Sequence, residues 1–244
     1  VTFNTEGYFY PDRNIKFMKN KKTYYQLIID RSGSMFACME QMVEGINRQI
    51  MRIREIAGRF PEREMITSLT LFNDEVLPVW DRLLPEELRE LTFADFRPEG
   101  NTALLDAIGI TVKKLQQHDG IENGGDEDSF VVIIVTDGYE NASRHFTLSI
   151  ISDRIRELES TGRWTFSYMG STLDAVSVAA GLNIRKKNAM SFTIQDIRKM
   201  FDKVEFDPEF FSVRHNKSGL NDQENGGVMG SSGVNGLFRW NTDI

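Results

Sequence analysis

The chain has very little cysteine and no long apolar run. Cys38 is the only cysteine among 244 residues, so no disulfide can form within the chain, and a reducing compartment is the natural expectation. The longest apolar segment, residues 130–135, has the length of a strand, whereas a membrane-spanning helix needs about 20 residues. We therefore expect no membrane insertion.

An excess of positive charge is also missing. The formal net charge is -7, which provides no general attraction to phosphate backbones or to anionic lipid surfaces, so nucleic acid is not expected as a partner. Residues 1–22 show no basic start followed by an apolar stretch, and they begin with Val1, so an upstream segment can have been removed. These features favour a cytoplasmic location.

Two common catalytic patterns are absent from the sequence. No G-x-x-x-x-G-K-[ST] segment occurs, so a nucleotidase with a phosphate-binding loop is not supported. Cys38, next to Met39 in a segment of helical spacing, is expected to pack in the core and not to act as a nucleophile.

Strand-length apolar runs alternate with segments of helical spacing through most of the chain. This alternation predicts an α/β fold with a doubly wound, mostly parallel sheet and helices on both faces. The strands are expected at residues 24–30, 65–72, 76–84, 130–136, 164–169 and 188–193. The helices are expected at residues 35–58, 102–117, 148–160, 172–180 and 194–204, with a short additional helix opening at Pro85.

Two of these strands have a predicted place in the sheet. The connector Asn73-Asp74-Glu75 is short and polar, which favours a hairpin and hence one antiparallel strand at a sheet edge. Residues 130–136 are apolar at almost every position, the pattern of a central strand that is buried on both faces.

The predicted domain occupies residues 23–204 and is flanked by two extensions. Residues 1–22 form an N-terminal extension without a clear period. Residues 205–244 form a C-terminal extension that becomes rich in glycine and polar residues, and we expect flexibility from about residue 216.

Five oxygen-bearing residues map to one edge of the predicted sheet. Asp30 and Asp137 end two strands, Ser32 and Ser34 follow the first of them, and Thr102 precedes a helix. Ligands of open α/β sheets bind at the carboxyl ends of the strands, so we expect these side chains to meet. Two carboxylates and three hydroxyls, without His or Cys, favour a hard cation and not zinc or copper. The sequence therefore predicts a site for Mg²⁺ or Mn²⁺, with a coordination position left for a partner's carboxylate.

These motifs carry a resemblance to a known family. Asp30-Arg-Ser32-Gly-Ser34 matches a D-x-S-x-S signature, Thr102 follows Gly100-Asn101, and Asp137 lies in Thr136-Asp137-Gly138. The segment from about residue 23 to residue 204 resembles a von Willebrand factor type A (vWA) domain with an intact metal-ion-dependent adhesion site. The resemblance implies a Rossmann-like fold, direct metal contacts from Ser32 and Ser34, and direct or water-mediated contacts from the other three residues.

The resemblance also implies a function. Domains of this family bind proteins through the metal, commonly through a partner's Asp or Glu, and are not usually enzymes. The soluble bacterial type fits best, since no disulfide or secretion signal is seen. Bacterial members often act beside AAA+ ATPases or other operon neighbours, although no residue here selects one of these partners.

Residues near the predicted site have two interpretations. Tyr139, Glu140 and Asn141 follow Asp137 and are candidate partner contacts, although a helix cap or a solvated loop is an alternative for Glu140 and Asn141. Met35, Phe36 and Met42, which follow Ser34, are expected in the core.

Two other functions compete with protein binding. A phosphohydrolase of haloacid-dehalogenase-like type also has an Asp-rich loop after its first strand, but it needs a second carboxylate two residues after the nucleophile, where this chain has Ser32. A metal that serves only stability is the other alternative.

Overall fold

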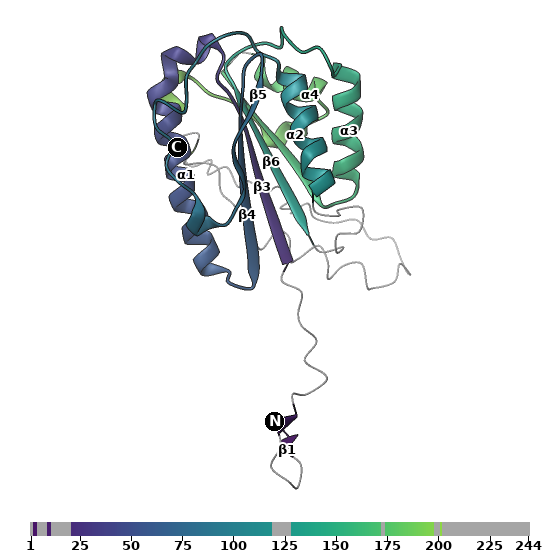
Figure 1. Ribbon diagram of the computed structural model, residues 1–244. Helices are drawn as coiled ribbons and strands as arrows, with labels where there is room; N and C mark the ends of the chain where they lie inside the picture. Colours follow the sequence, from purple (N-terminus) through teal and green to yellow (C-terminus); the bar gives the residue numbers. More distant parts are fainter. Residues whose placement is uncertain are drawn as a thin grey trace, which may run out of the picture.

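The computed structural model describes residues 2–3, 9–10, 21–118, 128–171, 174–197 and 201. Its main body is a six-stranded sheet in the order β5-β4-β3-β6-β7-β8, with helices on both faces (Figure 1). The short strands β1 (Thr2–Phe3) and β2 (Phe9–Tyr10) form a separate antiparallel pair. The extension 205–244, including its predicted flexibility, lies outside the described residues, as does most of 1–22.

Every strand pair of the large sheet is parallel except one. β4 and β5 run antiparallel as the predicted hairpin, and β5 forms a sheet edge. The other pairs, β3–β4, β3–β6, β6–β7 and β7–β8, are parallel, which confirms the predicted α/β class. The strands are β3 (Lys21–Asp30), β4 (Arg63–Phe72), β5 (Val76–Leu83), β6 (Ser129–Thr136), β7 (Trp164–Gly170) and β8 (Ala189–Ser191).

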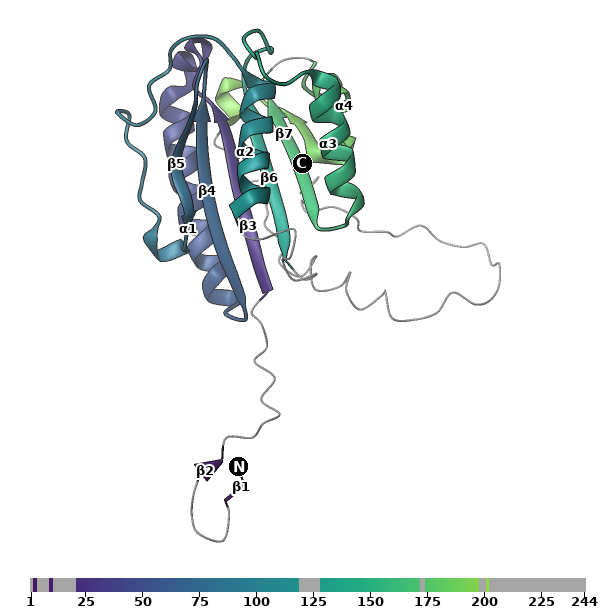
Figure 2. The same cartoon turned by 45° about the vertical axis from the view of Figure 1, so that its right-hand side comes forward.

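The helices form one layer on each side of the sheet. One face is covered by α1 (Met39–Arg59), and the other is covered by α2 (Leu104–His118), α3 (Leu148–Ser160) and α4 (Ala175–Gly181), as Figures 1 and 2 show. Short 3₁₀ helices are η1 (Gly33–Cys38), η2 (Pro85–Glu87), η3 (Lys186–Asn188) and η4 (Ile194–Asp196). No helix in the described part of the chain is long and apolar enough to cross a membrane.

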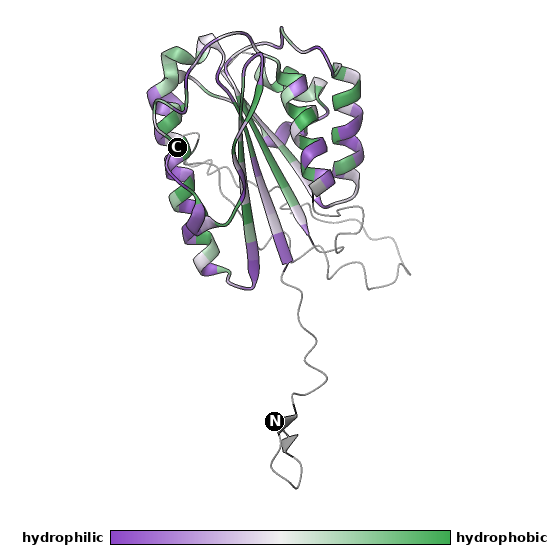
Figure 3. Ribbon diagram, viewed as in Figure 1, coloured by the Kyte–Doolittle hydropathy of each residue, from purple (hydrophilic) through white to green (hydrophobic). Residues whose placement is uncertain are grey.

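The sheet separates the buried hydrophobic residues into two clusters, one on each of its faces. β6 is buried at all its positions, as the continuous apolar run predicts. The register places Tyr24, Phe130 and Trp164 side by side, and their rings stack with centroids 4.9 and 4.3 Å apart. Each aromatic pair of this kind contributes about 0.5–1.5 kcal/mol beyond the area it buries. Figure 3 shows strands that are green, and hence apolar, along much of their upper length and purple at their lower ends, between helices that carry both colours.

The first helix differs from its predicted form. The single helix expected at 35–58 is divided into η1 and α1, because the chain first turns with a 3₁₀ bond from Met35 N to Ser32 O (3.0 Å). In a 3₁₀ turn, residues three apart lie on one side, so Met35 and Cys38 are buried together. Cys38 and Met42 are in the core as expected, but the prediction for Phe36 is wrong, since this side chain is exposed.

Other element boundaries shift by a few residues. β3 begins at Lys21, where its pairing with β4 already holds, so residues 21–22 belong to the sheet. α2 begins at Leu104 and leaves Thr102 in the preceding loop. α4 begins at Ala175, and residues 172–173 of its predicted range lie outside the described residues. The predicted closing helix at 194–204 starts as η4, and only Ile197 and Phe201 of the rest are described, both as helix.

Candidate metal site

The carboxyl ends of the central strands bring the predicted site residues to one edge of the sheet. Asp30 is the last residue of β3 and pairs with Phe72 of β4, while the preceding residue of β3, Ile29, pairs with Val135 of β6. The loops that follow β3 and β6 therefore begin side by side, at the upper edge of the sheet in Figure 1.

A chain of hydrogen bonds connects four of the five predicted residues. Asp30 Oδ1 accepts from Ser32 N at 2.6 Å, and its Oδ2 accepts from Thr136 Oγ1 at 2.6 Å. The hydroxyls of Ser32 and Ser34 are 3.1 Å apart, and Ser34 Oγ donates to Asp137 Oδ1 at 2.6 Å. The two carboxylates and the two serine hydroxyls thus form one connected polar cluster.

Thr102 reaches the same cluster from the loop before α2. A Cβ placed on Gly138 would lie 3.1 Å from Thr102 Oγ1, 3.7 Å from Ser34 Oγ and 3.8 Å from Asp30 Oδ2. The oxygens of the three residues therefore converge on the space beside Gly138, and a side chain there would crowd them. The structure brings all five predicted residues together.

The two carboxylates of this cluster have little to balance their charge. Burial raises the pKa of Asp30 to about 6, against hydrogen bonds from Thr136 and Ser32 that lower it, and the charge of Asp137 adds to the rise. Burial also raises the pKa of Asp137, opposed by its hydrogen bond from Ser34. Among the described residues, neither carboxylate forms an ion pair with a Lys, Arg or His side chain. A cation stabilises such a pair of acids, one buried and one partly buried.

The donor set fits a hard divalent cation. Its oxygens come from two carboxylates and three hydroxyls, the ligand types that Mg²⁺ and Mn²⁺ accept. The described residues contain no group of three or more His, Cys, Asp or Glu side chains placed to hold a metal, so carboxylates alone make no site and the hydroxyls are needed. A hydroxyl that now donates to a carboxylate can rotate and offer its lone pairs to a metal.

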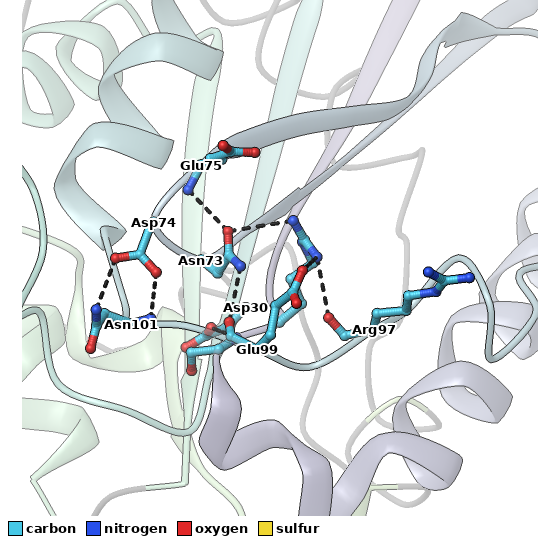
Figure 4. Close-up of polar contacts among 9 residues, drawn as sticks. Asp30, Asn73, Asp74, Glu75, Arg97, Glu99 and Asn101 are labelled. Carbon is cyan, nitrogen blue, oxygen red and sulfur yellow. Dashed lines mark hydrogen bonds and ion pairs between the residues drawn. The ribbon is translucent and has the colours of Figure 1, made fainter.

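Arg31, inside the D-x-S-x-S motif, holds the loop after β3 against the neighbouring loops. Its guanidinium is almost wholly buried and donates to Arg97 O (3.2 Å), Glu99 Oε1 (3.3 Å) and Asn73 Oδ1 (3.4 Å). Asn73 Nδ2 in turn donates to Glu99 O at 2.9 Å (Figure 4). The loop after β3, the hairpin turn and the segment before Thr102 are held as one unit.

Asp74 of the hairpin turn fixes the segment next to Thr102. Its carboxylate accepts from Asn101 N at 2.7 Å and from Asn101 Nδ2 at 2.9 Å (Figure 4). The hydrogen bonds from Asn101 lower the pKa of Asp74. Gly100 has a φ of +72°, and a Cβ there would collide with Asp74 Oδ2, so another residue would be strained and would displace the Asp74 carboxylate.

Glu140 and Asn141 are occupied by contacts within the domain. Glu140 Oε2 accepts from Leu105 N at 2.9 Å, at the start of α2, and its Oε1 accepts from Ser143 N at 2.7 Å. Asn141 Oδ1 accepts from Thr102 N at 2.9 Å, and Asn141 N donates to Thr102 O at 3.0 Å. These contacts position the Thr102 loop, as the capping alternative predicts for Glu140. A direct contact with a partner stays a prediction.

Tyr139 lies differently from its two neighbours. Its side chain is 56% exposed, and its hydroxyl donates to Asp174 Oδ2 at 3.3 Å. Of the three candidate partner contacts, it is the one that presents a large apolar surface to the solvent.

Sequence reasoning missed several supporting residues. Thr136, which binds Asp30, could have been noticed as the polar end of an otherwise apolar strand. Asp74 lies in the predicted hairpin connector and Asn101 in the motif that ends at Thr102, and the sequence predicts no contact between them. Their contact joins positions 27 residues apart, and nothing in the spacing indicates it.

Comparisons with known proteins support the fold. No protein-family model matches the chain, and no curated protein matches it. Among solved structures, proximal thread matrix protein 1 of the mussel byssus aligns with 17% identity and a TM-score of 0.52, covering 75% of this chain and 44% of its own. The ArnB paralog VWA2 of Sulfolobus acidocaldarius aligns with 13% identity and a TM-score of 0.52, covering 77% of this chain and 46% of its own.

The likeness to these structures, one of which is named VWA2, shows that the chain has the vWA Rossmann-like fold. A further mussel structure, at 12% identity and a TM-score of 0.50, is described with a zinc-occupied MIDAS motif, and the match covers 75% of this chain and 44% of that one. In each case the chain spans less than half of the neighbour's length. At such identities the likeness establishes the fold alone.

Proposed function

We propose that this chain is a divalent-metal-dependent protein-interaction module. It holds Mg²⁺ or Mn²⁺ through Asp30, Ser32, Ser34, Thr102 and Asp137, and it binds an Asp or Glu side chain of a partner protein. One observation carries the proposal: the wholly buried Asp30 carboxylate shares a hydroxyl cluster with Asp137, without a basic side chain among the described residues to balance the charge.

The charge count of the site explains why a partner carboxylate is expected. Two carboxylates nearly balance a divalent ion, and the hydroxyls are neutral, so the bound ion would still attract one more anionic ligand. Ser34 is exposed and Asp137 is partly exposed, whereas Asp30 is buried, so this open side of the site faces the solvent.

We further propose that the site is not catalytic. A haloacid-dehalogenase-like mechanism needs an acid two residues after Asp30, and the structure has Ser32 there, hydrogen-bonded to Ser34. The chain is therefore expected to release no phosphate from p-nitrophenyl phosphate in Mg²⁺. Release that is lost in Asp30→Asn would instead support the phosphohydrolase. We also propose that the protein is bacterial and cytoplasmic. Its partner would then be an AAA+ ATPase or the product of a neighbouring gene in the same operon.

The proposal is tested first by metal binding. Isothermal titration with Mg²⁺ and Mn²⁺, together with thermal unfolding in metal and in EDTA, is expected to show saturable binding and a higher Tm with metal. At a metal concentration of 100 Kd the stabilisation is about 2.7 kcal/mol. Asp30→Asn and Asp137→Asn are expected to lose both effects. Asp95→Asn, at a partly buried acid outside the site that accepts from Thr92 N and pairs with Arg89, is the control and should keep them.

Two results would contradict the proposal. One is the absence of metal binding in the wild-type chain. The other is metal binding that raises Tm while acidic peptides bind equally well in EDTA, which would leave the metal with a role in stability alone.

A further inference from the structure

Two exposed aromatic side chains flank the candidate metal site. Phe36 is 71% exposed and lies two residues after Ser34, and Tyr139 is 56% exposed and lies two residues after Asp137. Ser34 and Asp137 themselves are joined by a 2.6 Å hydrogen bond. Two residues of chain span at most about 7 Å, so each aromatic residue leaves the backbone within about 7 Å of the site residue that precedes it by two positions.

The local structure fixes the outward direction of Phe36. In η1, Met35 and Cys38 are buried three residues apart, and Phe36 lies on another side of the turn. Burying Phe36 would require a turn that exposes Met35 or Cys38, so its exposure is built into the fold. Because Phe36 follows Ser34 by two positions, its exposed ring begins next to the candidate metal site in the chain.

Tyr139 is held on the opposite loop. Its hydroxyl donates to Asp174 Oδ2 at 3.3 Å, which restrains the ring while leaving more than half of the side chain exposed. A tethered, exposed aromatic ring gives up little conformational freedom on binding, which favours its use as an interface anchor.

Exposed apolar residues that are scattered singly over a surface need no explanation. Met51 of α1 is 67% exposed and Phe93 is 51% exposed, and neither adjoins a candidate metal ligand in the chain. Phe36 and Tyr139 differ because each follows, by two positions, a residue of the cluster that is proposed to hold the metal ion and, through it, a partner's carboxylate. This closeness along the chain favours a binding surface that includes the metal site and both aromatic side chains.

We propose that Phe36 and Tyr139 form an apolar rim that selects the partner, and that the ligand is an acidic residue with an aromatic or large aliphatic side chain one or two positions away. The inference rests on the proposed function. A lone carboxylate is common on protein surfaces and selects poorly, whereas an apolar neighbour adds buried area and excludes water from the metal–carboxylate contact. The rim therefore supplies specificity, and the metal supplies the anchor.

The test is a peptide selection on the full chain. A displayed library with a central Asp or Glu and randomised positions on both sides is bound in Mg²⁺ and eluted with EDTA. Wild-type protein is expected to enrich aromatic or large aliphatic residues beside the acid. The best synthetic peptide is then titrated against variants, and Phe36→Ala and Tyr139→Ala are expected to weaken its Kd about tenfold.

The controls separate the rim from general effects. Met51→Ala and Phe93→Ala remove exposed apolar groups of similar size elsewhere and should leave the Kd within about twofold. Phe36→Leu should restore most of the affinity. The Mg²⁺ affinity measured without peptide should be equal in wild type and Phe36→Ala, which shows that the site itself is intact.

The possible failures are distinguishable. EDTA-eluted peptides that share the acid but show no apolar preference would overturn the rim and leave the proposed function standing, as would equal Kd values for wild type, Phe36→Ala and Tyr139→Ala. Peptides bound equally in Mg²⁺ and EDTA would overturn the proposed function, and the rim with it.

Discussion

Two pairs of acidic residues near the site differ in the hydrogen-bond donors to their carboxylates: Asp106 and Glu140 form one pair, and Asp30 and Asp137 form the other. Asp106 accepts from the backbone N–H groups of Arg144, His145 and Phe146 at 2.8–2.9 Å, and Glu140 accepts from those of residues 105, 142 and 143. Asp30 and Asp137 together accept from one backbone N–H and two hydroxyls. Both groups lie in or beside the loops at the carboxyl edge of the sheet.

The pKa values follow this difference. Burial raises the pKa of Asp106, but the three backbone hydrogen bonds outweigh it, and the pKa lies below the ordinary value. For Asp30 the outcome is opposite, because burial outweighs the hydrogen bonds. A carboxylate met by fixed N–H donors serves as a structural tether, whereas one met mainly by rotatable hydroxyls remains able to bind a cation.

The largest expected effect is the loss of a tether. Asp106→Ala leaves three N–H groups of residues 144–146 without their acceptor, at about 1 kcal/mol each, so the free energy of unfolding should fall by about 3 kcal/mol. Urea unfolding in EDTA measures this. Asp106→Asn keeps one acceptor oxygen and should fall between wild type and Asp106→Ala.

Asp30→Asn supplies the contrast in the same assay. An amide can accept from Ser32 N and donate to Thr136 Oγ1, and it removes a buried charge, so stability in EDTA should be unchanged or higher. If Asp30→Asn proved as destabilising as Asp106→Ala, the two groups of carboxylates would not differ in role.

The pH dependence of stability gives a second test of the structural role of the Asp106 carboxylate. Because the folded-state pKa of Asp106 is lowered, its contribution is present above the ordinary pKa of 3.8 and is lost as the pH falls through the lower folded value. Asp106→Ala should therefore lose stability less steeply than wild type below pH 3.8.

An intermediate effect is expected at Thr102, which supplies a neutral oxygen to the site. Thr102→Val keeps the shape but removes the hydroxyl, and the Kd for Mg²⁺ should rise about tenfold, equivalent to about 1.4 kcal/mol. Thr102→Ser retains the oxygen and should bind within a few-fold of wild type. Equal Mg²⁺ affinity of Thr102→Val and wild type, measured by titration calorimetry, would remove Thr102 from the site.

The smallest effect concerns a support outside the ligand set. Asp74→Ala frees Asn101 beside Thr102, so the Kd for Mg²⁺ should rise about two- to fivefold with little change in Tm. Asp95→Ala removes another acid that accepts from a backbone N–H, at a partly buried position outside the site, and is the control that should leave the Kd unchanged. A larger effect of Asp95→Ala than of Asp74→Ala on metal affinity would argue against this support.

Much of the fold could be read from the sequence because its pattern is local. The continuous apolar run at 130–136 predicts a central strand, and the short connector at Asn73 predicts the antiparallel edge; both are confirmed. The helix predicted at 148–160 has the observed bounds of α3. The five site residues were predicted from their positions after strands and before a helix, and the structure brings them together.

Other features depend on contacts between distant segments. Phe36 was predicted as core from its apolar neighbours, but the 3₁₀ turn of η1 places it outside. The burial of Arg31 and its bonds to residues 73, 97 and 99 cannot be foreseen from a charged residue in a loop motif.

The sequence by itself determined the strand-and-helix alternation and the chemical nature of the site, since both follow from residue type and spacing along the chain. Only the tertiary structure decided which carboxylates keep an unbalanced charge and which are satisfied by backbone N–H groups. It also decided that the side chains of Phe36 and Tyr139 are exposed. Hydrogen bonding and burial depend on segments that are far apart in the chain, and folding alone brings these segments together.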